Sequence, residues 1–220
     1  MSQEHEQLQR SWIANAEAWR DAVREQRIES RRLVTDRAVV EAVLGRRPRT
    51  VLDLGCGEGW LARALASHGI DVTGVDASAP LIDAARAEGG AHFVVASYAE
   101  LTADPSLAGA RFDLIVANFS LLDDRAEELL AALAAISGAC IVQTVHPPFA
   151  GGDYADGWRT ETFDSMAGEW REAMPWYFRT LGSWVGLFRR AGYTLTDILE
   201  PLNPKGVPAS ILFIGETAGK

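Results

Sequence analysis

The chain has 220 residues, of which 48% are hydrophobic, and this length and composition suit one α/β domain with a buried core. Its 21 basic and 30 acidic residues give a formal net charge of −9. This charge disfavours nucleic acid as a partner, because phosphate backbones are bound by clustered Lys and Arg, and it favours a small molecule instead.

The first seven residues are polar, and no apolar run in the chain approaches membrane-spanning length. We therefore expect neither secretion nor a membrane partner. The two cysteines, Cys56 and Cys140, lack metal-ligand spacing, so neither a metal site nor a structural disulfide is expected. These features predict a cytoplasmic protein, and they leave monomer and homodimer open.

Apolar residues recur at helical spacing between residues 7 and 44 and predict two helices with a break near residues 27–30. Trp12 and Trp19 lie in the first of these helices. They would either seal the helix onto a sheet or contact a ligand, and both interpretations are open.

The apolar run at residues 51–54 ends in residues 55–59, where every second residue is a glycine, directly before another helical pattern. This order predicts a strand, a tight turn and a helix. The turn is bare, because its glycines carry no side chains, and a ligand can therefore approach its backbone. The dinucleotide fingerprint G-x-G-x-x-G requires a third glycine where this chain has Trp60, so NAD and NADP are not expected to bind. A carboxylate at Asp53 instead suits a cationic ligand.

The heptad D-L-G-C-G-E-G at residues 53–59 resembles the first motif of the class I S-adenosylmethionine-dependent methyltransferases. The resemblance implies that the glycine turn passes beneath the methionine part of S-adenosyl-L-methionine and that Asp53 receives its amino group, directly or through water. A second acid, Asp76, follows the strand at residues 71–75 and offers two acceptor oxygens to ribose hydroxyls. The cofactor-binding residues implied in these two segments are Asp53, Gly55, Cys56, Gly57, Gly59, Asp76 and Ala77.

Two further strand ends complete the expected cofactor site. Ser97 and Tyr98 follow a strand at residues 93–96, and Ser97 stands where many relatives have an Asp that accepts a hydrogen bond from adenine. A serine hydroxyl accepts more weakly than a carboxylate. Asn118 and Phe119 follow a strand at residues 112–117, and the resemblance places them facing the methyl donor.

A fifth strand at residues 138–145 leads into residues 147–179, which are rich in glycine and aromatic residues. A long insertion of this kind favours a cap over an acceptor site, and an oligomer contact or a small auxiliary core is the alternative. The candidate substrate-binding residues are Trp19, Tyr154, Trp158, Tyr177 and Arg179, and Arg159 and Arg171 are further cations that could hold an acidic acceptor.

His146, at the end of the fifth strand, is the candidate general base for an oxygen or nitrogen acceptor. Its alternative role is to fix the turn into the cap or to stack on Phe149. His5 belongs to an N-terminus that is expected to fray.

The region after the cap predicts a helix at residues 183–190 and strands at 193–199 and 210–215. Residues 184–201 resemble the end of many small-molecule methyltransferases, including the ubiquinone-biosynthesis type. The expected fold is a single α/β domain with a Rossmann-like, doubly wound, seven-stranded sheet that contains one antiparallel strand. Its expected parts are N-terminal helices in 1–47, a cofactor-binding core in 48–146, a cap insertion in 147–179, and a C-terminal helix and hairpin in 180–220.

The resemblance implies S-adenosylmethionine-dependent transfer of a methyl group to a small-molecule acceptor, in which the protein acts mainly by positioning the reactants. Two alternatives remain. One is a non-catalytic S-adenosylmethionine-binding regulator or partner subunit. The other is aminopropyl transfer to a polyamine, for which Asp153, Asp156 and Asp164 would supply carboxylates.

Overall fold

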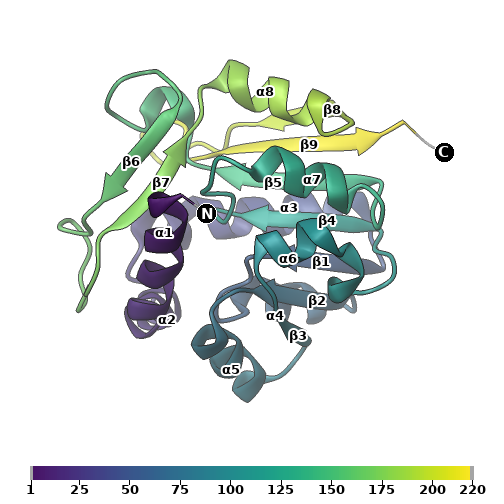
Figure 1. Ribbon diagram of the computed structural model, residues 1–220, viewed down its shortest axis with the longest axis horizontal. Coiled ribbons are helices and arrows are strands. Elements are labelled where there is room, and N and C mark those ends of the chain that lie inside the picture. Colours follow the sequence, from purple (N-terminus) through teal and green to yellow (C-terminus); the bar gives the residue numbers. More distant parts are fainter. Residues whose placement is uncertain (1, 219–220) are drawn as a thin grey trace.

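The computed structural model describes residues 2–218, and a seven-stranded sheet of order β3-β2-β1-β4-β5-β9-β8 lies at its centre (Figure 1). β1 to β5 pair in parallel, while β9 runs antiparallel to both of its neighbours. The predicted doubly wound sheet with one antiparallel strand is therefore confirmed. The strands are β1 (Thr50–Leu54), β2 (Asp71–Asp76), β3 (His92–Val95), β4 (Leu114–Asn118), β5 (Ala139–Thr144), β8 (Tyr193–Leu199) and β9 (Ile211–Thr217).

Helices cover both faces of this sheet. One face is covered by α6 (Tyr98–Ala103), α7 (Ala126–Leu133) and α8 (Leu181–Arg190), which bury Leu130 and Phe188 against it. The other face is covered by α3 (Asp36–Arg46), α4 (Trp60–Ala66) and α5 (Ala79–Glu88), which bury Val39 and Leu65. The central strands are almost wholly buried between these layers, as expected for a parallel sheet. A short 3-10 turn, η2 (Pro105–Ala108), follows α6.

The N-terminal region forms more helices than the sequence predicted. It contains α1 (Gln3–Ala14), α2 (Ala16–Arg24) and a π-helical stretch, η1 (Arg31–Thr35), that leads into α3. Residues 25–28 are not helical, so the predicted break is present. The division at Asn15 was not expected, because the apolar spacing continues across it. Asn15 is buried and bonds to the backbone of Glu172, so a tertiary contact separates α1 from α2.

The segment inserted after β5 begins with a 3-10 turn, η3 (Pro147–Phe149), and forms an antiparallel pair of strands, β6 (Gly157–Glu161) and β7 (Met174–Phe178). Figure 1 shows this hairpin together with α1 and α2 at one end of the main sheet. Leu8, Phe163 and Met174 form the buried centre of an apolar cluster that is separate from the two clusters on the sheet faces. The N-terminal helices and the hairpin therefore pack on each other.

The described part of the chain, residues 2–218, has no helix that is both long and apolar enough to cross a bilayer. The same residues contain no group of three His, Cys, Asp or Glu side chains that could hold a metal ion.

Candidate functional site

A cavity of about 790 Å³ lies at the carboxyl ends of the parallel strands. Each of β1 to β5 contributes wall residues at or just after its last residue, and α1, α2 and the β6–β7 hairpin supply the rest. Small-molecule sites have volumes of roughly 300–1,000 Å³ and, in open α/β sheets, lie at this edge of the sheet. The cavity is therefore the candidate functional site.

The glycine turn after β1 forms one wall of the cavity. Gly55 and Cys56 both donate their backbone N–H to the carbonyl of Val75, at 2.8 and 3.0 Å, which fixes the turn against β2. Gly57 has a φ of +57°, which L side chains rarely adopt. Gly59 has a φ of +83°, and a Cβ there would lie 2.7 Å from the ring of Phe93. Both glycines are therefore required for the shape of the turn.

Asp76 joins the glycine turn to the end of β2. Its Oδ2 accepts the backbone N–H of Gly57 at 2.9 Å, and its Oδ1 accepts that of Ser78 at 2.8 Å. Burial raises the pKa of Asp76, although these two hydrogen bonds oppose the shift. Asp76 and the following Ala77 line the cavity, which places the acceptor oxygens beside the bare turn.

Asp53 lies beneath the turn and not on the cavity wall. It is only 1% exposed, and its Oδ2 has no hydrogen-bond partner among the described residues. Burial, and to a lesser extent the charge of Asp76, raise the pKa of Asp53 to about 7. Its carboxyl group is therefore poised between its two charge states near neutral pH. Direct contact with a ligand amino group remains a prediction for this residue.

Ser97 and Tyr98 line the cavity at the end of β3, but their hydroxyl groups are already engaged. Ser97 caps α6: its Oγ accepts the Glu100 N–H at 3.2 Å and donates to Glu100 Oε2 at 2.7 Å. Tyr98 donates its hydroxyl to the carbonyl of Ser120 at 3.1 Å. Ser97 in this arrangement is a helix cap, so its hydroxyl is engaged within α6.

Asn118 and Phe119 line the cavity at the end of β4. The Oδ1 of Asn118 is buried and has no hydrogen-bond partner among the described residues. Phe119 has a φ of +53°, a conformation that costs a bulky L residue about 1–3 kcal/mol. Its backbone N–H donates to the carbonyl of Gln143 at 2.8 Å, which holds the turn in place. Strain of this kind concentrates at functional sites.

The far end of the cavity is aromatic. Trp12 and Trp19 line it, with ring centroids 5.2 Å apart, and Phe163 of the cap lies 5.7 Å from Trp19 with its ring at 87°. The sequence left open whether these tryptophans pack a helix in place or contact a ligand, and the structure is compatible with both roles. They pack on the cap as part of its cluster, and they also face the cavity.

His5 is a cavity residue that the sequence did not reveal. Its side chain is almost fully buried, its Nε2 lies 2.7 Å from Asp124 Oδ1, and its ring meets Trp158 edge to face at 5.4 Å. The polar composition of the first residues predicts fraying. The contacts that bury His5, with Asp124 and Trp158, are more than a hundred residues away in the chain, and only its contact with Ser2 is local. The local sequence offers only a helix-capping contact with Ser2, which does not show that His5 reaches the cavity.

Four of the predicted substrate-binding residues do not line the cavity. Tyr154 accepts the Leu181 N–H at its hydroxyl oxygen, and Trp158 and Tyr177 pack edge to face at 5.5 Å. Arg179 is buried, donates to the carbonyl of Asp123 at 2.6 Å and lies over the Tyr177 ring. Of the predicted set, Trp19 is the residue that lines the cavity.

His146 also lies outside the cavity lining. Its Nε2 is 2.6 Å from Glu200 Oε1, and its ring packs at 5.0 Å on Phe149, the contact that its alternative role requires. No contact joins His146 to the glycine turn in this arrangement. Its assignment as a general base stays a prediction.

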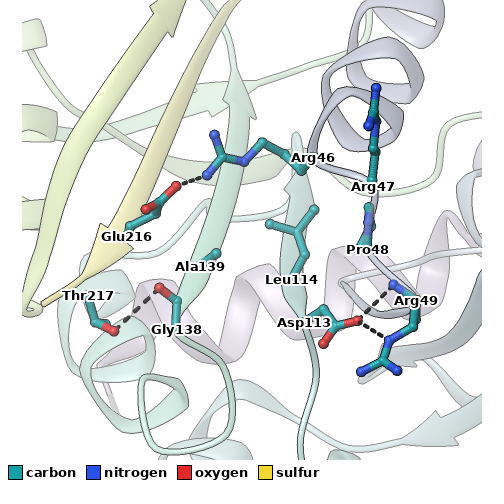
Figure 2. A pocket seen from close by; sticks show the side chains of 10 residues that line it. All are labelled: Arg46, Arg47, Pro48, Arg49, Asp113, Leu114, Gly138, Ala139, Glu216 and Thr217. Carbon is teal, nitrogen blue, oxygen red and sulfur yellow. Dashed lines mark hydrogen bonds and ion pairs between the residues drawn. The ribbon is translucent and has the colours of Figure 1, made fainter. Parts of the chain in front are cut away.

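A second hollow of about 530 Å³ lies at the opposite edge of the sheet, where β1 and β4 begin (Figure 2). Arg46 pairs there with Glu216, and Arg49 lies 3.7 Å from Asp113. Figure 2 shows these side chains directed at one another across the hollow. This site is remote from the glycine turn, and its carboxylates already compensate these two cations.

Comparisons with known proteins agree with this geometry. Residues 51–139 match the family model described as a methyltransferase domain. A malonyl-[acyl-carrier protein] O-methyltransferase of Pseudescherichia vulneris is 42% identical over 76 residues, which are 34% of this chain and 29% of that protein. The ribosomal RNA small subunit methyltransferase C of Klebsiella pneumoniae is 41% identical over 91 residues, or 40% and 26% of the two chains. A ubiquinone biosynthesis O-methyltransferase of Coxiella burnetii is 51% identical over 47 residues, or 21% and 20%.

The chain thus spans less than a third of the length of these three curated relatives. A solved structure covers far more of it. The 1,6-didemethyltoxoflavin-N1-methyltransferase of Burkholderia thailandensis aligns with 100% of this chain and 92% of its own, at 23% identity and a TM-score of 0.66. This likeness shows the shared fold. Residues 51–139 therefore match a methyltransferase domain, and the sheet order and this solved structure give the whole chain a Rossmann-like methyltransferase fold.

Proposed function

We propose that the chain binds S-adenosyl-L-methionine in the cavity and transfers its methyl group to a small-molecule acceptor. The observation that carries this proposal is the position of Asp76, which lines the cavity while it holds Gly57 of the bare glycine turn. The names of the matched relatives, all methyltransferases, support the activity. The proposed cofactor-binding residues are Asp53, Gly55, Cys56, Gly57, Gly59, Asp76, Ala77, Ser97, Tyr98, Asn118 and Phe119.

When it is bound, S-adenosyl-L-methionine supplies a methyl group on a sulfonium that an acceptor lone pair can displace. The residues of the chain position the two reactants and exclude water. In this proposal the carboxyl ends of β1 and β2 hold the donor, and the end of β4 faces the reacting atoms. α1, α2 and the β6–β7 hairpin cover the acceptor, because they complete the cavity wall beyond β4.

A small acceptor is favoured over a macromolecule, although the matched relatives include enzymes named for ribosomal RNA and for an acyl-carrier protein. The formal charge of −9 opposes binding to RNA. Residues on α1, α2 and the hairpin line the cavity together with the strand ends, which suits an enclosed ligand. The structure of the Burkholderia enzyme, with bound 1,6-didemethyltoxoflavin and S-adenosylhomocysteine, is an example of a small acceptor on this fold.

Two further parts of the proposal concern location and the alternative reaction. The buried free thiols of Cys56 and Cys140 support a cytoplasmic location, where cysteines stay reduced. Aminopropyl transfer lacks support, because Asp153, Asp156 and Asp164 do not line the cavity. Asp156 instead bonds to the backbone of Thr180 at the start of α8.

The test is calorimetric titration of the purified protein with S-adenosylhomocysteine and, separately, with NAD. We expect S-adenosylhomocysteine to bind and NAD to show no micromolar affinity, because the glycine spacing fits only the first. Incubation with methyl-labelled S-adenosyl-L-methionine and a panel of metabolites then identifies the acceptor. NAD binding without S-adenosylhomocysteine binding would overturn the proposal.

A further inference from the structure

We infer that the acceptor is an uncharged, flat aromatic molecule, held between Phe119 at the end of β4 and an aromatic wall formed by Trp12, Trp19, Phe163 and Trp176. This inference rests on the proposed function, which by itself does not define the acceptor. It follows from the composition of the cavity wall, from two strained aromatic residues, and from the pairing of the cations that line the cavity.

The aromatic wall comes from three separate segments. Trp12 lies on α1, Trp19 on α2, and Phe163 and Trp176 belong to the cap, yet all four line the one cavity. Leu8 and Met174 fill the space beside them. Aromatic rings offer flat, rigid contact surfaces and stabilise other rings beyond the burial of area alone. A wall of this composition suits an aromatic ring better than a flexible or strongly hydrated acceptor.

Two aromatic residues of the cavity are held in a strained backbone conformation. Among the described residues other than glycine, four have a positive φ, and two of these are Phe119, at +53°, and Phe163, at +62°. Both line the cavity, one from the strand ends and one from the cap. Glycine or asparagine would adopt this backbone more easily. A phenylalanine at each position therefore places an aromatic ring at the cavity despite a backbone cost, which is typical of strain at functional sites.

The cations on the acceptor side are already paired within the described residues, and Glu161, a cavity carboxylate without a paired cation among them, accepts the backbone N–H of Phe163 at 2.7 Å. Arg20 lies 2.8 Å from Asp21, and Arg125 lies 3.3 Å from Asp123. His5 is paired with Asp124 at 2.7 Å. Arg125 retains a buried Nε without a hydrogen-bond partner, but its charge is shared with the neighbouring carboxylate. An anionic acceptor would therefore lose its hydration without gaining a free cation, which disfavours a carboxylate.

The experiment measures binding of four matched probes by calorimetry, with the protein saturated by S-adenosylhomocysteine. The probes are 2-naphthol, its saturated analogue decahydro-2-naphthol, the anion 2-naphthoate and the cation 2-naphthylmethylammonium. We expect 2-naphthol to bind at least about fivefold more tightly than each of the other three, because ring contacts and the absence of charge both favour it. Trp12→Ala should abolish this preference, while the affinity for S-adenosylhomocysteine stays unchanged.

Phe149→Ala is the matched control, because Phe149 is an exposed aromatic residue at the start of the cap and does not line the cavity. It should leave the preference for 2-naphthol intact. Phe119→Gly adds a second measurement: it relieves the backbone strain, so the melting temperature should hold or rise while the affinity for 2-naphthol falls.

Three results would overturn the inference: equal or tighter binding of any of the other probes, binding of none of the four, or a preference that survives Trp12→Ala. Each of these results, obtained with normal S-adenosylhomocysteine binding, leaves the proposed methyl transfer standing. Loss of S-adenosylhomocysteine binding in the unmodified protein would instead refute the proposed function itself.

Discussion

Arg24 on α2 donates from its Nε to Glu58 Oε2 in the glycine turn at 3.0 Å. The same oxygen accepts Arg63 Nη2 at 2.7 Å, and the side chain of Glu58 is only 2% exposed. Arg24 also lies 3.1 Å from Glu88 at the end of α5. The helix that carries Trp19 is therefore tied, through one buried carboxylate, to the turn that is proposed to hold the cofactor.

The first prediction concerns the ion pair between Arg24 and Glu58. Arg24→Gln removes one cation from Glu58 but leaves Arg63 in place. We expect the free energy of unfolding, measured by urea denaturation, to fall by about 1 kcal/mol, the value for a charged hydrogen bond reduced by partial solvent screening. Arg37→Gln is the control, because Arg37 pairs with Glu41 at 3.7 Å on the exposed surface of α3. Equal losses of unfolding free energy in the two variants would show that the Arg24–Glu58 pair stabilises the protein no more than an exposed surface pair does.

A second prediction concerns Asp76. Asp76→Ala removes the acceptor of the Gly57 N–H and the oxygens proposed for the ribose hydroxyls. We expect the affinity for S-adenosylhomocysteine to fall about 10- to 100-fold, as for loss of hydrogen bonds to a charged group. Asp71→Ala is the control, because Asp71 is exposed at the opposite end of the same strand. Unchanged affinity in Asp76→Ala, with a folded protein by circular dichroism, would exclude the ribose assignment.

The main sheet and the cofactor side of the site could be predicted from sequence, because their signals are local. Each strand is a short apolar run, and its last residue marks the edge at which ligands bind. The position of Asp76, 19 residues beyond Gly57, is an example: the strand pattern alone places it beside the turn, and the structure shows the hydrogen bond.

The acceptor side could not be predicted in the same way, because its contacts join segments far apart in the chain. His5 is buried by Asp124 and Trp158, and Phe163 is placed by Trp19 and Trp170. The aromatic content of the cap was visible in the sequence, but it did not show which rings face the cavity. Tyr154 and Tyr177 have the same composition signal as Trp176, and only Trp176 lines the cavity.

A third prediction follows from the raised pKa of Asp53, which burial shifts from its ordinary value of 3.8 to about 7. Between pH 3.8 and about 7, the folded state therefore keeps a proton on Asp53 that the unfolded state has released. The stability that this proton contributes is complete below about pH 4 and is lost as the pH rises towards 7. Asp53→Asn removes this titration, so the fall in stability between these pH values should become shallower.

The control for this measurement is Asp113→Asn. Asp113 is an exposed carboxyl before β4, and the backbone N–H of Arg49 lowers its pKa. Its titration is therefore shifted away from the range between pH 4 and 7, and its loss leaves the slope in that range unchanged. Thermal unfolding of the three proteins across this range gives the comparison. Parallel curves for Asp53→Asn and the unmodified protein would show that Asp53 is ionised throughout.

A fourth prediction concerns the polar contact between the N-terminal helices and the cap. Asn15 Oδ1 accepts the Arg171 N–H at 2.7 Å, and its Nδ2 donates to the carbonyl of Glu172 at 2.7 Å. Asn15→Ala removes both of these hydrogen bonds and leaves the Glu172 carbonyl with only the longer bond from Ser11 Oγ at 3.3 Å, at a cost of about 1–3 kcal/mol. We expect a lower melting temperature and faster proteolysis within the cap. Asn203→Ala is the control, because Asn203 makes similar backbone contacts in an exposed turn.

The last prediction separates two histidines with similar local surroundings. His5 and His146 are both buried, and each has its Nε2 close to a more exposed carboxylate, at 2.7 and 2.6 Å. Only His5 lines the cavity. We therefore expect His5→Ala to raise the acceptor KM, since it alters the wall, and His146→Ala to leave that KM unchanged. Steady-state kinetics with the acceptor from the metabolite screen gives both KM values.

The assignment of His146 as a general base requires another result: a lower kcat in His146→Ala, recovered in part as the pH rises, with unchanged binding of S-adenosylhomocysteine. A kcat equal to that of the unmodified protein at every pH would exclude that assignment.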